Sequence, residues 1–256
     1  MMLRTSPLSF HELVAFVLIA ATPAIASGGE KVPFDVAEIF FELNHTDGDL
    51  GIHGSIDGDA WRRLTIDGPG KHGRSLLNVA AQGRLKQQGL TEVFFESDEP
   101  GFDELSPEEF FERFEEGTYE VRGVTLDGEK LESEVEISHV LPAPAGNIRI
   151  SGVAAAENCD AVPLPEVSPP IVIDWDPVTS SHPDIGADGA VAIANYEVVL
   201  EFEDGGPVMS VELPPSVTAI QIPSAFINLA DSFKFEILAR DENGNRTAVE
   251  SCFDLD

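Results

Sequence analysis

The sequence has few basic residues, and this shortage excludes several classes of partner. Its 256 residues hold 15 Lys and Arg against 46 Asp and Glu, which gives a formal net charge of -31. Such a surface repels nucleic acid and anionic membranes, because both carry phosphate charge. We therefore predict an acidic protein without a nucleic-acid partner. The excess of acid favours divalent cations, a basic partner or simple solubility in salt.

The sequence also lacks the common catalytic motifs. It contains no G-x-S-x-G segment of the kind that presents a nucleophilic serine, and residues 68–71 lack the spacing of a phosphate-binding loop. Pairs among 46 acids arise by chance, so they do not by themselves indicate a glycosidase. The histidines are scattered; His45 and His53 are spaced to meet across a hairpin, but surface imidazoles are commoner than metal ligands. We predict no catalytic residue.

No apolar run in the sequence is long enough to span a bilayer, which takes about 20 residues. Residues 13–21 are a short apolar run, preceded by Arg4 and followed by Ala24-Ile25-Ala26, the A-x-A pattern of a cleavage site. We interpret residues 1–26 as a signal peptide. The interpretation predicts an exported protein, periplasmic or secreted, with no membrane span.

Cysteine is scarce, with only Cys159 and Cys252 in the chain. In an oxidising compartment two cysteines in one domain suggest a disulfide. Two unpaired thiols or a metal site are the alternatives, although two cysteines without a third ligand at close spacing make a poor zinc site. A bridge that closes so long a loop is worth about 4–5 kcal/mol on the chain-entropy estimate.

Short strands with one apolar face make up most of the remaining chain. Phe233, Phe235 and Ile237 alternate with polar residues, and Asn243-Gly244 then supplies the tight turn of a terminal hairpin. The first half shows similar patterns, and we interpret Asp57-Gly58-Asp59 as another hairpin turn. The strands expected there cover residues 37–44, 51–56, 61–66, 76–81, 92–97, 118–126 and 130–140.

One helix is expected among these strands, near residues 106–114. Ser106 suits the N-cap, Pro107 the first turn and Glu109 the capping-box position. Phe110 and Phe114 give this helix an apolar face. The predicted helix ends before Gly117.

Residues 141–146, LPAPAG, form the best domain boundary in the sequence, because a proline-rich segment interrupts the strand pattern. We predict an all-β protein of two tandem immunoglobulin-like or fibronectin type III-like β-sandwiches. The first domain covers residues 27–145 and contains the helix, and the second covers residues 146–256.

The second domain resembles a fibronectin type III domain over about residues 147–256. Trp175 lies where that family keeps its core tryptophan, Tyr196 lies in an I-x-x-Y-x-V segment, and residues 233–239 are similar to its Y-x-V-x-V-x-A strand. Phe233 departs from the family tyrosine and loses its hydroxyl hydrogen bond, worth about 1 kcal/mol. The resemblance implies that Trp175, Tyr196 and Phe233 share one core.

The same resemblance places Cys159 and Cys252 at one pole of the sandwich, which supports a disulfide between them. It implies a spacer or binding module without catalysis. In the first domain, residues 116–121 are similar to a G-T-Y strand entry common in extracellular β-domains, although a fold similarity says little about function.

A polar cluster in the first domain suggests calcium. Asp47, Asp49, Asp57 and Asp59 lie close together in sequence, and Ca²⁺ takes six to eight oxygen ligands. The EF-hand pattern fails, because glycine occupies its fifth and twelfth positions counted from Asp47. Asp-Gly turns chosen for backbone conformation are the alternative explanation.

The sequence therefore predicts a non-catalytic exported protein that binds or spaces its partners. The partner would be an extracellular or periplasmic protein or glycan, and no cofactor other than Ca²⁺ is suggested. A calcium-dependent carbohydrate-binding module is one alternative. An enzyme of unknown type in the first domain is another, and a deep pocket with converging titratable groups would favour it.

Overall fold

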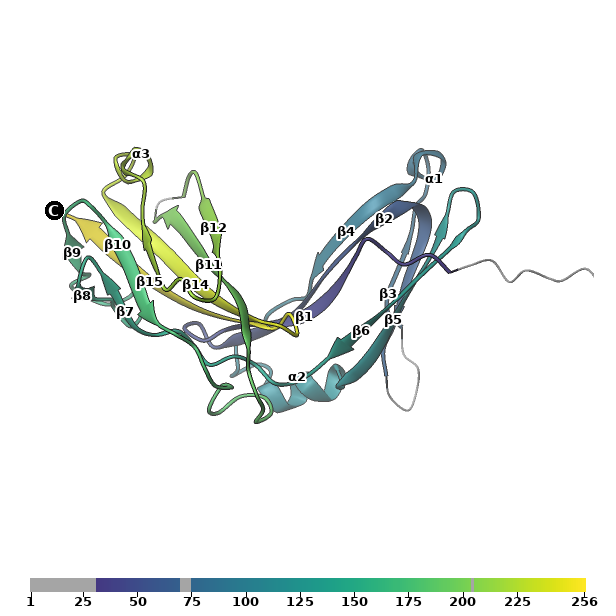
Figure 1. The fold of residues 1–256 in the computed structure, drawn as a ribbon, viewed down its shortest axis with the longest axis horizontal. Coiled ribbons are helices and arrows are strands. Elements are labelled where there is room, and N and C mark those ends of the chain that lie inside the picture. The colour runs from purple at the N-terminus through teal and green to yellow at the C-terminus, as the bar shows by residue number, and fades with distance from the viewer. Residues whose placement is uncertain (1–30, 70–74, 204) are drawn as a thin grey trace, which may run out of the picture. The chain divides into compact units, whose positions relative to one another are not determined.

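A computed structural model describes residues 31–69, 75–203 and 205–256. Within these ranges β-strands predominate over a few short helices, so the predicted all-β class is confirmed (Figure 1). Among the described residues no helix is both long and apolar enough to cross a bilayer. The predicted signal peptide, residues 1–26, lies outside the described residues.

The first half is built around one long strand, β2 (Asp49–Asp67), which pairs with four other strands. Its first part lies between β1 and β4, and its second part lies between β3 and β5, which also pairs with β6. The first half thus contains a single bent sheet and not two separate sheets. The four partner strands are β1 (Val36–Asn44), β3 (Ser75–Ala80), β4 (Leu90–Glu96) and β5 (Gly117–Thr125), and β6 (Lys130–Ile137) extends the sheet beside β5.

The hairpin turn expected at Asp57-Gly58-Asp59 is wrong, because β2 continues through these residues. The pairing register with β4 shifts between Asp57 and Trp61, so the segment bends the strand instead of reversing it. Gly58 is buried, and a Cβ atom there would lie 3.1 Å from the Phe34 side chain. This glycine serves close packing inside the bend, which is a recognised use of glycine in strands.

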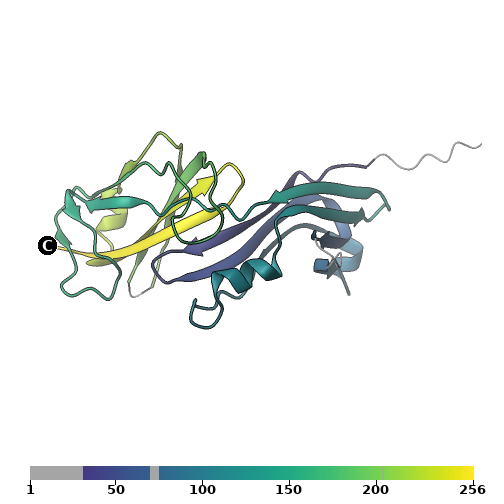
Figure 2. The ribbon, with the colours of Figure 1, turned by 90° about the horizontal axis from the view of Figure 1, so that it is seen from below.

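The predicted helix is present as α2 (Pro107–Arg113), and it packs on β1 (Figure 2). The Ser106 side chain accepts a hydrogen bond from the Glu109 amide at 3.3 Å, as expected of an N-cap. Phe110 and Phe111 approach Phe41 of β1 edge-on, with ring centroids 5.8 and 5.4 Å apart. A further single turn, α1 (Leu85–Gln88), lies between β3 and β4.

The second half encloses its core between two sheets, which is the architecture that the fibronectin type III resemblance implies. One sheet has the order β12-β11-β14-β15, with β9 added to β15, and the other has the order β13-β10-β7-β8; α3 follows β13. The bounds are β7 (Gly146–Ile150), β8 (Val153–Ala154), β9 (Glu166–Val167), β10 (Val172–Asp176), β11 (Ile193–Phe202), β12 (Met209–Leu213), β13 (Ala219–Gln221), α3 (Ser224–Ile227), β14 (Ser232–Asp241) and β15 (Arg246–Leu255).

Trp175, Tyr196 and Phe233 lie in one buried core cluster of this second half. The rings of Trp175 and Tyr196 meet edge-on at 5.3 Å, and the Tyr196 hydroxyl accepts a hydrogen bond from the Val178 amide at 2.8 Å. A disulfide joins Cys159 to Cys252 across 93 residues of sequence.

The two halves share a sheet, because β15 pairs in parallel with β1 (Figure 1). The Asn245 side chain, 1% exposed, reinforces this pairing: its carbonyl accepts from the Phe41 amide, and its amide group donates to the carbonyls of Ser138 and Val140, all at 2.8–2.9 Å. Lys31–Asp256 form one compact unit with two separate cores. The division into domains at residues 145 and 146 stays a prediction.

Candidate functional site

Charged side chains gather on the face of the shared sheet that points away from both cores. Strands alternate their side chains, so Phe41 of β1 enters the first core while Glu42 points to the other face. In β14 likewise Phe235 is buried in the second core, and Glu236 lies opposite. A groove of about 240 Å³ follows this face, lined by Glu42, His53, Phe94, Glu96, Glu197, Val199, Glu236, Leu238 and Arg246.

His53 of β2 is the most buried polar residue of the groove, with 5% of its surface exposed. It lies opposite Phe40 in one neighbouring strand and Glu96 in the other, and its ring stacks on Phe40 at 5.4 Å. His53 Nε2 is 2.8 Å from Glu99 Oε1. Burial lowers the pKa of His53. The hydrogen bond to Glu99 and the negative charges of Glu42, Glu99 and Glu96 raise it by more, so that the pKa lies above its ordinary value.

Glu99 reaches His53 because β2 has a glycine beneath it. A Cβ atom on Gly51 would lie 2.7 Å from Glu99 Cδ, closer than real Cβ contacts allow. The segment that carries Glu99 is fixed on both sides. The Ser97 amide donates to the Ile52 carbonyl at 3.0 Å, and the Phe102 amide donates to the Gly48 carbonyl at 2.9 Å. Glu99 is therefore held over the strand by backbone contacts as well as by His53.

Two further carboxylates lie next to this pair and experience its charge. Burial raises the pKa of Glu42, with Glu99 and Glu236 also raising it, whereas His53 and Arg246 lower it. Burial, Glu99 and Asp47 raise the pKa of Asp49 to about 6. Burial is thus the main reason that the pKa values of both carboxylates are raised, and shifted carboxylates of this kind are common at sites that bind cations or do chemistry.

The structure brings together only half of the predicted calcium ligands. Asp47 and Asp49 lie at the turn between β1 and β2, where the Asn44 amide donates to Asp47 Oδ2 at 3.2 Å. Asp57 and Asp59 lie farther along β2, and eight residues of strand from Asp49 to Asp57 span about 26 Å. The four aspartates therefore do not form one site, and calcium binding by them stays a prediction.

The sequence alone does not single out Glu96 and Glu99, and it favours a surface position for His53. His53 lies opposite Glu96 because β2 pairs with β4. These two strands are far apart in the sequence, so no local pattern indicates the pairing. One signal was present: Gly51 and Gly54 interrupt a strand, and glycines in strands often mark a close approach. A Cβ on Gly54 would indeed lie 2.4 Å from the Phe95 ring. The glycine in the sequence does not, however, identify which residue approaches it.

His45 meets a different histidine from the one expected. Its Nδ1 lies 3.1 Å from Nε2 of His182, a residue of the second half that is 3% exposed. His182 Nδ1 accepts hydrogen bonds from the amides of Asp184 and Ile185, so its proton lies on Nε2. Burial, and then the charge of His45, lower the pKa of His182.

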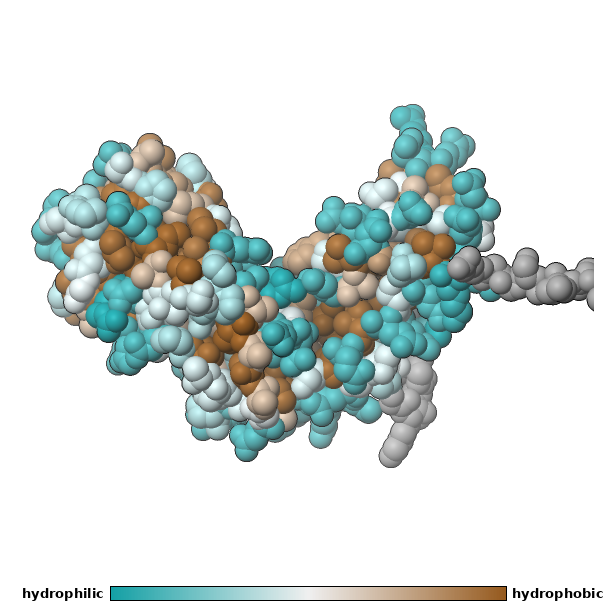
Figure 3. All heavy atoms as spheres, in the orientation of Figure 1, coloured by the Kyte–Doolittle hydropathy of each residue, from teal (hydrophilic) through white to brown (hydrophobic). Residues whose placement is uncertain are grey.

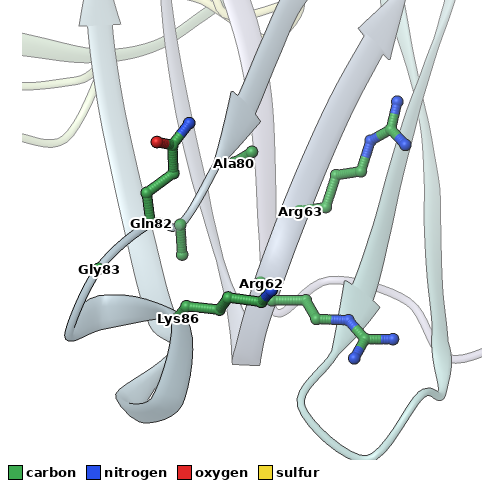
Figure 4. Close-up of a pocket in the computed structure, with 7 residues that line it drawn as sticks. Arg62, Arg63, Ala80, Gln82, Gly83 and Lys86 are labelled. Atoms are coloured by element: carbon green, nitrogen blue, oxygen red, sulfur yellow. The ribbon is translucent and has the colours of Figure 1, made fainter.

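A second, basic pocket of about 520 Å³ lies on the first half, where Lys86 of α1 extends toward Arg62 (Figure 4). Arg62 and Arg63 are adjacent yet both exposed, because the register of β2 against β5 shifts at this point. No ion pair of the described residues involves Arg62, Arg63 or Lys86. Trp61, which precedes Arg62 in the sequence, is fully buried and therefore offers no exposed aromatic ring for a ligand to stack on.

The exposed surface mixes apolar and hydrophilic residues on the face drawn in Figure 3. Phe94, 59% exposed, lies at the groove with its ring 6.2 Å from that of His53. Leu229 in the second half is 61% exposed. Single exposed apolar residues are ordinary on protein surfaces, so Phe94 is notable only for its position beside the charged groove.

No family model matches the chain, and no curated protein matches its sequence. Similar solved structures include a tetra-tandem repeat in the extending region of a large adhesion protein, at 11% identity and TM-score 0.29, covering 86% of this chain and 50% of that one. Chicken CNTN1 FN1–FN3 domains match at 8% identity and TM-score 0.34, covering 88% of this chain and 65% of that one. A segment of two fibronectin type III domains from chicken tenascin matches at 10% identity and TM-score 0.27, covering 86% of this chain and 97% of that one.

The chain spans half of the first of these structures and about two thirds of the second. All three TM-scores are below 0.5, so these similarities do not indicate what this chain binds or does. Its function has to be argued from its own residues.

Proposed function

We propose that this chain is a non-catalytic exported protein that acts as a binding or spacer unit. The apolar run and A-x-A pattern of residues 1–26 support export. The Cys159–Cys252 disulfide supports an oxidising compartment, where such bonds persist. The partner is an extracellular or periplasmic protein or glycan.

The observation that carries the proposal is the shared sheet between the two cores. Neighbouring domains usually move relative to each other unless their interface is large. Here backbone pairing of β1 with β15 joins the halves, and the buried Asn245 side chain adds three hydrogen bonds across the join. The Thr247 hydroxyl also donates to the Pro142 carbonyl at 2.7 Å. A unit joined in this way transmits position and force, which is what a spacer requires.

The basic pocket offers the proposed binding surface. An exposed group of Arg62, Arg63 and Lys86 attracts anions, and arginine pairs geometrically with carboxylate, phosphate and sulfate groups. The protein as a whole is strongly acidic, with a formal net charge of -31, and repels anionic partners elsewhere. An acidic glycan or an acidic protein segment would therefore be directed to this pocket.

Calorimetry of the mature chain, residues 27–256, tests the spacer proposal. We expect one unfolding transition for the wild type, and separated transitions for Asn245→Ala, which removes the partner of the buried Phe41 amide and of two half-buried carbonyls. Asn243→Ala is the matched control, because within the described part of the chain the Asn243 side chain bonds only to Asp241 of its own turn. Two independent wild-type transitions, or equal behaviour of the two variants, would contradict a joined unit.

N-terminal sequencing of the natural protein tests export. We expect Ser27 as the first residue of protein recovered from the envelope or from the culture fluid. Protein that retains residues 1–26 in the cytoplasm would contradict this part of the proposal.

Calcium binding is a second candidate, favoured by the carboxylates at the β1–β2 turn. Asp47 lies near Glu250 and Asp160, whose charges raise its pKa after the larger effect of burial. Calcium at this turn would raise the melting temperature relative to chelator, and Asp47→Asn would remove that rise. Asp59→Asn, farther along the chain in the middle of β2, should keep it. An unchanged wild-type melting temperature would exclude this site.

A further inference from the structure

We propose that His53, Glu96 and Glu99 bind a divalent first-row transition-metal ion of the Zn²⁺ type. One ligand atom from each of the three side chains lies within 4.8 Å of the other two. The site differs from the aspartates predicted from the sequence, and it does not depend on the proposed spacer function. The inference goes beyond binding or spacing to a specific inorganic ligand.

The separations suit one shared ion. Zinc ligands lie about 2.0–2.2 Å from the metal, so two ligand atoms on one ion are at most about 4.4 Å apart. His53 and Glu99 already lie closer, at 2.8 Å, and they separate slightly when an ion replaces the proton between them. Glu96 is exposed, and its side chain has the freedom to complete the approach. Small rotations, without backbone movement, therefore close the site.

Two of the three ligands are fixed before any ion arrives. The His53 side chain is 7% exposed, and the stacked Phe40 ring sets its orientation. Glu99 lies over Gly51 on a segment that backbone hydrogen bonds pin on both sides. Because binding then costs little ordering, a preorganised pair of this kind favours metal affinity. An ordinary exposed cluster of acids lacks such a buried imidazole.

The local charge also favours a cation. Glu42 and Asp49 lie close enough to Glu99 for their charges to interact, and the Arg246 guanidinium lies 3.6 Å from Glu42. Glu96, Glu42 and Asp49 thus gather around the His53–Glu99 pair, and Arg246 pairs with one of them. A divalent ion offsets this excess, as bound metals do where they are the largest local charge.

The groove is lined by His53 and Glu96 but not by Glu99, and its size agrees with an ion better than with an organic ligand. Small-molecule pockets usually measure about 300–1,000 Å³, and this groove measures about 240 Å³. A water takes about 30 Å³ of liquid volume, so an ion with several waters fits. One water, or two in a five-coordinate arrangement, completes the coordination that three protein ligands leave open.

The ligand types select the class of metal. Imidazole suits Zn²⁺ and its neighbours, whereas Ca²⁺ takes six to eight oxygens and little nitrogen. One imidazole with two carboxylates therefore favours Zn²⁺ over Ca²⁺. Because zinc can bind weakly to many surfaces, the test has to separate this site from the nearby His45–His182 pair.

Isothermal titration of the mature chain with ZnCl₂ tests the site, with CaCl₂ in a parallel titration. We expect one zinc ion per chain at the site, and binding at least tenfold weaker for Glu99→Gln and His53→Gln. Glu92→Gln is the matched control, because Glu92 is an exposed acid on the same strand as Glu96. His45→Gln is a second control, and both controls should bind zinc as the wild type does.

Gly51→Ala provides a test that keeps all three ligands. Its Cβ would displace Glu99, so we expect zinc affinity to fall as it does for Glu99→Gln, while circular dichroism shows retained β-structure. Glu99 is partly exposed, so Glu99→Gln is expected to fold even if His53→Gln does not. Absence of zinc binding in the wild type, undiminished binding in Glu99→Gln, or tighter binding of Ca²⁺ than of Zn²⁺ would each overturn the proposal.

Discussion

The two halves of the chain enclose their cores in different ways. The second half places two sheets face to face and ties one loop to its last strand through Cys159–Cys252. The first half has no cysteine, and it wraps one sheet around its core by bending the 19-residue strand β2. A sandwich core needs alternation in every strand, whereas a bent sheet needs one strand that changes partners along its length. The comparison shows how similar strand patterns give two architectures.

Removing the disulfide should have the largest effect, and it should act on the second half. The double change Cys159→Ser and Cys252→Ser releases a loop whose ends are 93 residues apart. We expect a loss of about 4–5 kcal/mol, because the unfolded chain regains the conformations that the bridge excludes. Urea unfolding of the two proteins measures the loss.

Wild-type protein treated with a thiol reductant is the control, and it should unfold like the double variant. Equal midpoints for oxidised wild type and double variant would mean that the second core alone determines stability. The difference between the two halves would then lie only in sheet arrangement.

The sequence predicted the second half better than the first for a physical reason. Trp175, Tyr196 and Phe233 lie in strands whose period-2 alternation can be recognised locally, and the structure places them in one core. The Asp57-Gly58 pair is compatible with both a turn and a bend inside a strand. Only the pairing of β2 with β4 and β5, which is not local, decides between them.

The candidate site illustrates the same limit. His53 and Glu96 are paired across strands, and Glu99 arrives from a segment that follows β4. Close spacing in the sequence instead predicted Asp57 and Asp59 as ligands. Both lie farther along β2, away from the turn that holds Asp47. Sites assembled from several strands require the pairing to be known first.

Each core has one buried tryptophan, and the second prediction compares them. Trp61 Nε1 donates to the Thr91 carbonyl at 3.3 Å, whereas Trp175 Nε1 has no partner among the described residues. We expect Trp61→Phe to cost about 1–2 kcal/mol more than Trp175→Phe, because the second change removes an unsatisfied buried donor. Both changes delete similar apolar area. Denaturant unfolding of both variants measures the difference.

A larger loss for Trp175→Phe would contradict that expectation. It would mean that the indole of the second core has a partner, such as a buried water. The two cores would then be alike in their polar contacts.

The third prediction concerns α2, the helix that covers the first core. Ser106→Ala removes the acceptor for the Glu109 amide, and the loss of such a cap costs about 1 kcal/mol. Ser106→Asp keeps an acceptor and should stay close to wild type. Because Phe110 of α2 packs on Phe41, thermal unfolding should report the loss. An unchanged melting temperature for Ser106→Ala would show that packing alone positions the helix.

The smallest effect should come from His182, where the two halves meet through a histidine pair. Burial first, and then the His45 charge, lower the pKa of His182 below its ordinary value of about 6.5. The unfolded chain therefore binds a proton at a higher pH than the folded chain does. The stability contributed by neutral His182 is present above about pH 6.5, and it is lost as pH falls toward the folded pKa.

His182→Asn tests this linkage, because an asparagine oxygen can accept the Asp184 and Ile185 amides but does not titrate. We expect the wild type to lose more stability than this variant when urea unfolding at pH 5.5 is compared with unfolding at pH 7.5. His53 has a raised pKa and acts in the opposite direction in both proteins, so it cancels in the comparison. Equal losses would mean that His182 accepts its proton without disturbing the contact with His45. A smaller loss in His182→Asn would show that protonation acts on the contact between the halves.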